Sequence, residues 1–181
     1  MKRNSENTIA KKTIRFRGIR KVDRWLRGVL TILLTGAFLG SGCKSIHTEL
    51  EMQATPEAIW AVLLQNDKYG EWNPYHVRVD GALQTGNTIE VEIHKPNGNQ
   101  ITLQPEVIRM IKNRELTWGG GIPGLFTGEH VFEIVPTESG VLFVHREEFR
   151  GFFVLFAELD TIEEGYKQMN QALKKRVEEA R

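Results

Sequence analysis

The chain has 181 residues and a formal net charge of +1, and this length suffices for one domain with a real hydrophobic core. Residues 1–28 hold ten of the 24 Lys and Arg residues but only two of the 23 acidic ones, so residues 29–181 are acidic. An acidic domain repels a phosphate backbone, which excludes nucleic acid as its expected partner. The single cysteine excludes an internal disulfide.

The segment around the cysteine predicts targeting to a membrane. The basic head is followed by the apolar run Val29–Leu39, which has the length of a signal-peptide core and is short for a membrane span. Small residues then lead to Cys43. This order resembles a bacterial lipoprotein signal, in which the cysteine is diacylated and becomes the new N-terminus. Gly40 stands where the usual pattern has Leu, Val or Ile.

Other interpretations of this segment remain open. The apolar run could stay as an uncleaved membrane anchor, or it could be a secretory signal or follow a misassigned start. Cys43 could also be a small buried hydrophobic residue, although we expect it to lie outside the first strand. The lipoprotein interpretation divides the chain into a targeting segment, 1–42, and a ligand-binding domain, 43–181, anchored to a membrane of the cell envelope.

The predicted elements begin with a strand and two helices. Residues 46–54 alternate between polar and apolar side chains, as a strand does. A helix is predicted within 55–66, with Thr55 as its N-cap and Pro56 at its first position. A second, short helix is predicted within 67–75, ending before the proline there.

Strand patterns separated by turn residues fill the middle of the chain. The turns are marked by the stretches QTGN, PNGN, KNR and PTESG. The six strand candidates are 75–83, 87–95, 100–112, 114–119, 126–136 and 140–151. Their outward positions are polar, which predicts an antiparallel sheet with one solvated face.

The tail predicts a long amphipathic helix over about 154–179, with a possible break near 160–165. Its apolar side chains recur at spacings of three and four residues. They are Leu159, Ile162, Tyr166, Met169, Leu173 and Val177. The order of elements predicts an α+β fold in which one curved antiparallel sheet wraps around this helix.

The last two strand candidates place polar groups on an apolar face. The alternation that aligns Phe132, Ile134, Val141, Phe143 and Phe149 also puts His130, His145 and Glu147 on the same side. Same-face pairing requires partner numbers that sum to 275 or 277, so His130 faces either His145 or Glu147. Such groups must pair, stay neutral or touch water, which indicates a wet or ligand-filled cavity.

Four roles for this polar cluster stay open. His130 and Glu147 could form a private hydrogen-bonded pair that fixes strand register. They could orient the polar end of an otherwise apolar ligand. His130, His145 and Glu147 could serve as acid–base groups in catalysis. A zinc site is the least favoured role, and we expect no metal.

Aromatic residues suggest where a cavity would lie. Trp72 and Asn73 stand where the second helix gives way to a strand, although Asn73 could simply cap a turn. Trp118 precedes the stretch GGGIPG, which could be a loose strand bend or a flexible lip at a cavity mouth. The stretch FRGFFVLFAEL, 149–159, is expected to form a tight buried corner rather than a cavity entrance or membrane contact.

Several short stretches carry a resemblance to a known superfamily. They are ATPEAIWAVL, YGEWNPY, QPEVI, ELTW, GLFTGEHVF, VHREEFRG and MNQALKKRVE, and together they span about 46–179. The sequence resembles the START/Bet v 1-like (SRPBCC) superfamily, in particular its polyketide cyclase/dehydrase and lipid-transport-like group. The resemblance implies a helix-grip fold with a deep cavity between the curved sheet and the last helix. It implies no fixed catalytic set and no cofactor, because this superfamily includes lipid carriers, cyclases, hydrolases and co-chaperones.

The leading functional hypothesis is therefore non-enzymatic binding or carriage of a hydrophobic small molecule or lipid by a membrane-tethered domain. A cyclase-, dehydratase- or hydrolase-type enzyme is the alternative, and a protein-interaction module is a third possibility. The residues expected to line the cavity are Trp72, Asn73, Trp118, Phe126, His130, Phe132, Phe143, His145, Glu147, Phe149, Tyr166 and Met169. Cys43 is the expected lipidation site.

Overall fold

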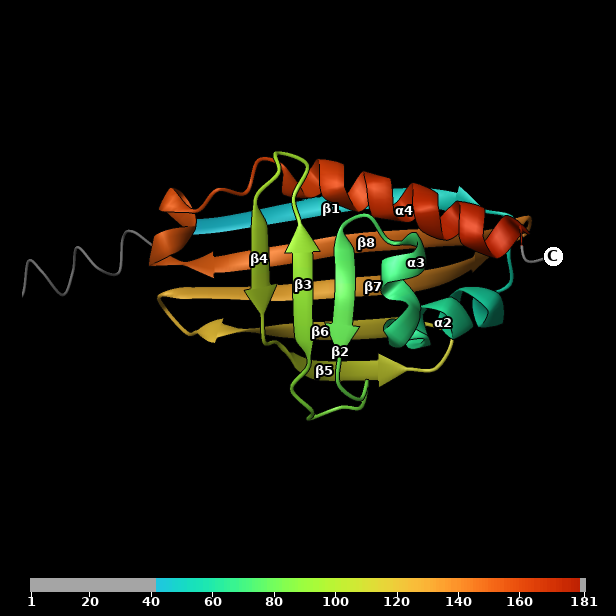
Figure 1. Ribbon diagram of the computed structural model, residues 1–181, viewed down its shortest axis with the longest axis horizontal. Coiled ribbons are helices and arrows are strands. Elements are labelled where there is room, and N and C mark those ends of the chain that lie inside the picture. Colours follow the sequence, from blue (N-terminus) through green and yellow to red (C-terminus); the bar gives the residue numbers. More distant parts are fainter. Residues whose placement is uncertain (1–41, 180–181) are drawn as a thin grey trace, which may run out of the picture. The chain divides into compact units, whose positions relative to one another are not determined.

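The computed structural model describes residues 42–179, which form two antiparallel sheets and a long C-terminal helix (Figure 1). The larger sheet has the strand order β1-β8-β7-β6-β5. Its strands are β1 (Gly42–Met52), β5 (Glu106–Ile111), β6 (Glu115–Ile122), β7 (Phe126–Thr137) and β8 (Gly140–Gly151). In Figure 1 the smaller sheet runs across the larger one. Its strands are β2 (His76–Asp80), β3 (Glu90–His94) and β4 (Gln100–Leu103).

Helical elements flank these sheets. They are α2 (Pro56–Leu64), η1 (Asn66–Lys68), α3 (Tyr69–Trp72), η2 (Phe152–Phe156) and α4 (Ile162–Glu179). Helix α4 packs against β1 and α2. The antiparallel sheet packed on a long C-terminal helix is the arrangement that the sequence predicts. Within residues 42–179, no helix combines the length and hydrophobicity needed to cross a membrane.

The predicted start of the first helix is confirmed. Thr55 lies just before α2, and its Oγ1 accepts a hydrogen bond from the Ala58 amide at 3.2 Å, with Pro56 at the first helical position. At the end of α3 the Asn73 Oδ1 accepts hydrogen bonds from the amides of Tyr75 and His76, both at 3.0 Å. Asn73 therefore caps the turn into β2, one of the two roles that its residue type allows.

The prediction of one continuous strand over residues 100–112 is wrong. The chain leaves the smaller sheet at Leu103 and enters the larger one at Glu106. Pro105 lies between them, and a proline cannot donate the hydrogen bond that a continuous strand would need. One isolated bridge, Thr88–Glu106, joins the two sheets in the described part of the chain. The single predicted sheet is thus divided in two.

The register of β7 and β8 follows one of the two predicted alternatives. His130 pairs with Glu147 and Phe132 with His145, so the partner numbers sum to 277. The apolar face of both strands points into the core, together with the three polar residues. The predicted placement of His130, His145 and Glu147 on the inner face is therefore confirmed.

The C-terminal helix starts later than the sequence predicts. Helix α4 begins at Ile162, and residues 157–161 connect it to the short 3₁₀ helix η2. Glu158 ties this connection to the β3–β4 hairpin. Its carboxylate accepts hydrogen bonds from Asn97 and, at 3.2 Å, from Asn99, and its carbonyl accepts one from Lys95 at 3.1 Å. These contacts hold residues 157–161 outside the helix.

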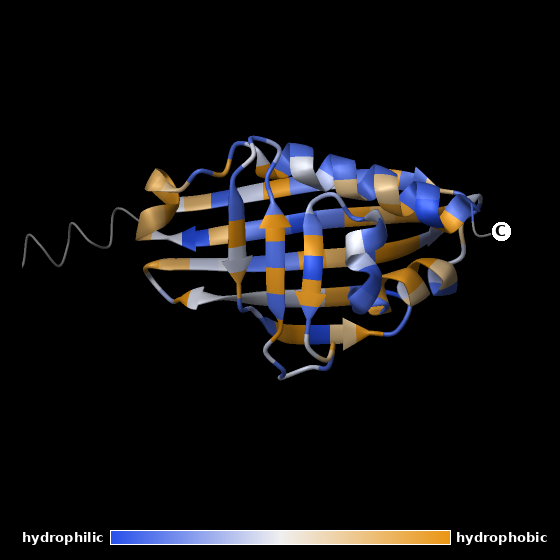
Figure 2. Cartoon of the chain, in the orientation of Figure 1, coloured by the Kyte–Doolittle hydropathy of each residue, from blue (hydrophilic) through white to orange (hydrophobic). Residues whose placement is uncertain are grey.

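The apolar stretch at η2 is exposed rather than a buried corner. Phe152, Phe153, Leu155 and Phe156 are 40%, 50%, 63% and 72% exposed, while Val154 alone is buried. A 3₁₀ helix of five residues cannot turn five apolar side chains to one side, so most of them face outward. Figure 2 shows η2 in the hydrophobic colours. We call these four exposed residues the η2 patch.

Cys43 lies inside the first strand and is exposed. It pairs with Arg150 of β8, and its Sγ lies 3.7 Å from Glu148 Oε1. The expectation that it precedes the first strand is wrong because the pairing of β1 with β8 continues back to Gly42. Its exposure also rules out the alternative of a buried hydrophobic cysteine.

Candidate ligand-binding cavity

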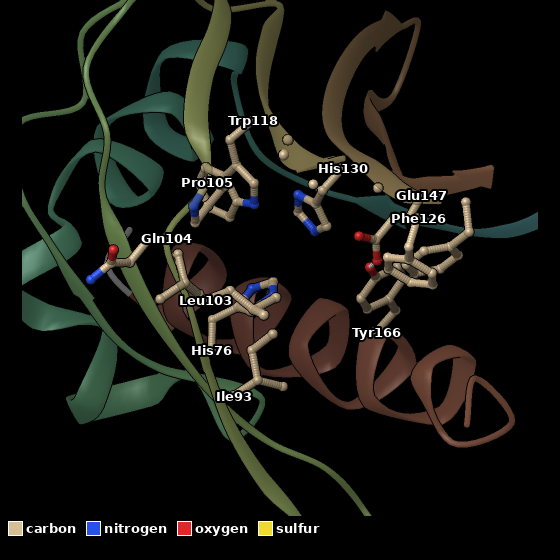
Figure 3. Close-up of a pocket in the computed structure, with 16 residues that line it drawn as sticks. His76, Ile93, Leu103, Gln104, Pro105, Trp118, Phe126, His130, Glu147 and Tyr166 are labelled. Carbon is tan, nitrogen blue, oxygen red and sulfur yellow. Dashed lines mark hydrogen bonds between the residues drawn. The ribbon is translucent and has the colours of Figure 1, made fainter. Parts of the chain in front are cut away.

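A cavity of about 180 Å³ lies between the two sheets. Its apolar walls are formed by Val91, Ile93, Leu103, Pro105, Phe126 and Phe149. Its polar residues are His76, Gln104, Trp118, His130, Glu147 and Tyr166. Figure 3 shows His76, His130, Glu147 and Tyr166 pointing into one space. Helix α4 contributes Tyr166 alone, so the smaller sheet rather than the helix forms the second wall.

Half of the predicted ligand-binding residues line this cavity. They are Trp118, Phe126, His130, Glu147, Phe149 and Tyr166. The others lie outside its lining: Trp72, Asn73, Phe132, Phe143, His145 and Met169. Phe132, Phe143 and Met169 fill the core next to it, because the region toward the C-terminal end of α4 is packed with side chains. His145 does not line the cavity but contacts the lining residue His130 through a hydrogen bond.

Sequence reasoning missed the wall formed by the smaller sheet. Val91 and Ile93 of β3 and Leu103 of β4 alternate as strand residues do, but this pattern does not reveal that their strands fold over the larger sheet. His76 was also missed. His76 is buried, and it follows the turn capped by Asn73. Asn73 was predicted to be a cavity residue, but its neighbour His76 was not.

Glycines make room for the cavity on the larger sheet. Gly119, Gly120 and Gly121 lie within β6 and line the cavity, so these three glycines belong to a strand. A Cβ at Gly120 would lie 3.6 Å from the nearest atom, the Pro105 Cα. A Cβ at Gly128 would lie 3.0 Å from Glu147 Oε1. Larger residues at these positions would fill the space or displace Glu147.

A chain of hydrogen bonds runs from α4 and β1 to the cavity. His130 Nε2 lies 2.7 Å from His145 Nε2, and His145 Nδ1 lies 2.9 Å from Asn170 Oδ1. The Asn170 Nδ2 donates to Thr48 Oγ1 at 3.0 Å, and Thr48 Oγ1 donates to the His145 carbonyl at 3.1 Å. Tyr166 donates separately to Glu147 Oε2. His130 and Glu147, which could have formed a private pair, are therefore each bonded to another partner.

Aromatic stacking fixes the rings of this cluster. The rings of His145 and Tyr166 stack at 3.6 Å with 17° between their planes. The rings of Trp118 and His130 stack at 4.9 Å with 8° between their planes. Neighbouring strands present these residues side by side, since Trp118 pairs with His130 and His130 with Glu147. The imidazoles therefore have little freedom to turn.

Burial keeps the three imidazoles neutral. It lowers the pKa of His76 to about 3, and it lowers the pKa values of His130 and His145 well below the usual histidine value. The carboxyl of Glu147 behaves in the opposite way, because burial raises its pKa to about 7 against a smaller lowering by the Tyr166 hydrogen bond. Burial likewise raises the pKa of Tyr166.

The cluster does not have the form of a metal site. Among residues 42–179, no group of three or more His, Cys, Asp or Glu side chains is arranged to hold a metal ion. The two Nε2 atoms of His130 and His145 face each other at hydrogen-bond distance, and Glu147 is bonded to Tyr166. The two histidines and the carboxylate that could together bind a metal are thus engaged in two separate hydrogen bonds.

A family model described as "Polyketide cyclase / dehydrase and lipid transport" matches residues 44–178. The chain belongs to this family. The match covers three quarters of the sequence and begins after Cys43. No curated protein matches the chain. The family membership predicted from sequence is confirmed. The matched residues include both walls of the cavity.

Solved structures share the architecture of this polyketide cyclase and lipid transport domain. A protein of unknown function from Staphylococcus aureus has a TM-score of 0.61 at 11% identity, over 78% of this chain and 98% of its own. A Rhodobacter sphaeroides protein has a TM-score of 0.61 at 13% identity, over 78% and 99%. These likenesses confirm the α+β helix-grip fold.

A third solved structure is a two-domain protein with a stated pathway. The aromatase/cyclase StfQ from the steffimycin biosynthetic pathway has a TM-score of 0.58 at 13% identity, over 89% of this chain and 60% of its own. At this identity the likeness shows the fold alone. The function of this protein must therefore be inferred from the residues of its own cavity.

Proposed function

We propose that this domain binds a small, largely apolar molecule in the cavity between its two sheets. The observation that carries the proposal is the cavity itself, which has apolar walls and a few convergent polar groups, as small-molecule sites commonly do. A cavity of about 150 Å³ is known to accept benzene, so about 180 Å³ suits a single ring. A volume of about 180 Å³ is too small for a whole lipid.

The experiment titrates the full chain with toluene and follows the methyl resonances of Val91, Ile93 and Leu103 by NMR. The expected result is saturable shifts at these three residues. Leu103→Trp should weaken toluene binding at least tenfold by filling the cavity, whereas Ile111→Trp, at an exposed position of β5 outside the cavity, should not. Absence of any saturable shift at the lining methyls would overturn the proposal.

We further propose that the domain is held at a membrane through Cys43, as a lipoprotein of the cell envelope. Support comes from the surface around the start of β1. Cys43 is exposed, and a Cβ built at Gly42 would lie 3.1 Å from Val154 Cβ and 3.2 Å from Leu155 Cδ2. The η2 patch thus adjoins the point where a lipid anchor would attach. An exposed apolar patch beside such an anchor suits contact with a bilayer.

The tether is tested by expressing the full chain in a bacterial host with radioactive palmitate. Wild type should carry label and Cys43→Ser should carry none, while Cys43→Ser keeps the domain folded because the side chain is exposed. An unlabelled wild-type chain would refute lipidation. In that case recovery of the chain in the membrane fraction would indicate the uncleaved anchor instead.

General acid–base catalysis is a second candidate, favoured by one observation. Glu147 lines the cavity, and its raised pKa of about 7 suits proton transfer at neutral pH. Cyclohexanone in D₂O is a ring-sized probe for this activity. Wild type should accelerate exchange of its α-hydrogens and Glu147→Gln should not. Equal rates in the two proteins would remove this candidate.

A further inference from the structure

Glu147 is the one acidic side chain that lines the cavity, and no Lys or Arg of residues 42–179 lines it. His145 and Phe149, its neighbours on the inner face of β8, are buried, whereas Glu147 keeps accessible surface. In Figure 3 its carboxyl points into the space that it shares with His130. The accessible surface of this side chain therefore belongs to the cavity.

One oxygen of the Glu147 carboxyl is available to a ligand. Tyr166 donates to Oε2, whereas no hydrogen bond from the described residues engages Oε1. His130 Nδ1 is a buried atom without a partner, but Oε1 is not sealed off in this way and keeps surface that a molecule in the cavity can touch. A ligand can therefore bond to Glu147 without displacing Tyr166.

Facing glycines leave space next to this oxygen. Gly120 of β6 pairs with Gly128 of β7, and both residues line the cavity. A Cβ at Gly128 would lie 3.0 Å from Glu147 Oε1 and 3.4 Å from Phe149 Cε1. The missing side chain thus opens room between a carboxylate oxygen and an aromatic ring.

The groups packed around Glu147 supply no positive charge. The buried imidazoles of β2, β7 and β8 are neutral, because burial lowers their pKa values. Tyr166 of α4 and Tyr75, just before β2, are neutral as well, because burial raises their pKa values. Strands β3, β4 and β6 contribute no ionisable side chain to the lining. A carboxylate withdrawn from water without a counter-ion is unfavourable, which accords with the raised pKa of Glu147.

Aromatic side chains make the same cavity suitable for a cation. Trp118, Phe126, Phe149 and Tyr166 all belong to its lining. The faces of such rings attract positive charge, and they do so most strongly where water is excluded. A carboxylate and several rings can therefore act together on one positively charged group.

We propose that the cavity takes a compact ring molecule that carries a protonated amine, with the ammonium group paired to Glu147 Oε1. The inference rests on the proposed small-molecule binding and names the ligand class. The empty protein already bears the cost of withdrawing this carboxylate from water, so the ligand's ammonium is the only charge whose desolvation is new. A neutral ring offers no charge to Glu147, and an anionic ring would be repelled by it.

Matched probes test the preference on the full chain at pH 8. Benzylamine and benzyl alcohol have the same ring and linker and differ in an ammonium against a hydroxyl group, and toluene has neither. Benzylamine should bind at least about tenfold more tightly than benzyl alcohol, which corresponds to about 1.4 kcal/mol. Saturable binding of toluene with no preference for benzylamine would overturn this inference alone. Failure of all three probes would overturn the proposed function as well.

The preference should depend on pH through Glu147. Benzylamine is protonated at both pH 8 and pH 5.5, whereas the Glu147 carboxyl, with a pKa of about 7, is ionised only at the higher value. Benzylamine and benzyl alcohol should therefore bind about equally at pH 5.5. A preference of the same size at both pH values would show that another group holds the ammonium.

Carbon-13 NMR of the Glu147 carboxyl provides a readout that a purely structural role would not change. A ligand that binds the ionised form more tightly must favour that form, so benzylamine should lower the pKa of this carboxyl and benzyl alcohol should not. An unchanged pKa under saturating benzylamine would overturn the pairing.

Two variants locate the charge that is recognised. Glu147→Gln should lose the preference for benzylamine over benzyl alcohol. Glu133→Gln, which removes a carboxylate outside the cavity, should keep it. Loss of the preference in both variants would mean that the overall charge of the domain, rather than Glu147, attracts the amine. If Glu147→Gln does not fold, the pH series and the carboxyl titration of wild type still decide.

Discussion

Gly165 of α4 faces the ring of Tyr75 so closely that a Cβ at position 165 would lie 2.2 Å from Tyr75 Cδ2 and Cε2. Tyr75 is buried and its ring packs edge-on against Tyr166, with 5.4 Å between ring centroids, so it has no room to move. The glycine thus lets α4 approach the turn that leads into β2. This contact positions Tyr166 at the cavity.

Gly165→Ala is expected to destabilise the domain. Overpacking a core commonly costs about 1–3 kcal/mol, and the severity of this clash exceeds the gain of about 1 kcal/mol in helix propensity. Urea unfolding should show a net loss of about 2 kcal/mol in the free energy of unfolding. Gln171→Ala, at an exposed position of the same helix, is the control and should change it little. Equal stability of wild type and Gly165→Ala would show that the Tyr75 ring can move away from the added methyl group.

Asn170→Leu should be strongly destabilising although the two side chains are similar in size. It removes the acceptor of His145 Nδ1 and the donor to Thr48 Oγ1 in a buried region. A buried donor left without a partner costs about 1–3 kcal/mol, and the loss should appear in urea unfolding. Equal stability of wild type and Asn170→Leu would contradict the contribution of these buried hydrogen bonds.

Glu147 should make the domain less stable as the pH rises. Its carboxyl has a pKa of 4.5 in the unfolded chain and about 7 in the folded one. Between these pH values the folded state keeps a proton that the unfolded state releases, so the free energy of unfolding falls from pH 4.5 to 7 and is constant above. The contribution is at most about 3 kcal/mol.

The comparison of wild type with Glu147→Gln isolates this contribution. The difference in free energy of unfolding between the two proteins should change with pH only between about 4.5 and 7. All other titrating groups cancel in the difference. A difference that is flat over this range would mean that the Glu147 carboxyl titrates in the folded protein as it does in water.

The buried histidines should act in the opposite direction. Below the usual histidine pKa of 6.5 the unfolded chain binds protons that folded His76, His130 and His145 do not, so stability falls as the pH drops from 6.5 toward 3. Each contributes up to about 1.4 kcal/mol per pH unit. His76→Gln should lower the slope of the free energy of unfolding against pH by one proton. Parallel curves for the variant and wild type would contradict the burial of a neutral imidazole.

The sequence predicted the inner face of the larger sheet well. The alternation of side chains along β7 and β8 determines which of them share a face, and turn length limits the register to two values, of which the structure has one. His130, His145 and Glu147 could therefore be placed on one face. The two strands of a hairpin are close in the sequence, so their pairing can be predicted without a structure.

Contacts between distant elements could not be predicted in this way. Whether His130 bonds to Glu147 or to His145 depends on Asn170 and Tyr166, which approach from a helix packed across the sheet. The second wall of the cavity depends on the change of sheet at Pro105, which a strand pattern does not reveal. The late start of α4 accompanies the bonds of Glu158 to a hairpin that is distant in the sequence.

Few backbone hydrogen bonds join the two sheets. One bridge, Thr88–Glu106, and a few nearby backbone bonds, such as Ile89 N to the Pro105 carbonyl at 2.9 Å, connect them at one edge. At the far end the β3–β4 hairpin is attached through Glu158, whose bonds lie at the surface. Because an element held by few hydrogen bonds opens more readily, amides of the smaller sheet are expected to exchange with solvent faster than those of β7 and β8.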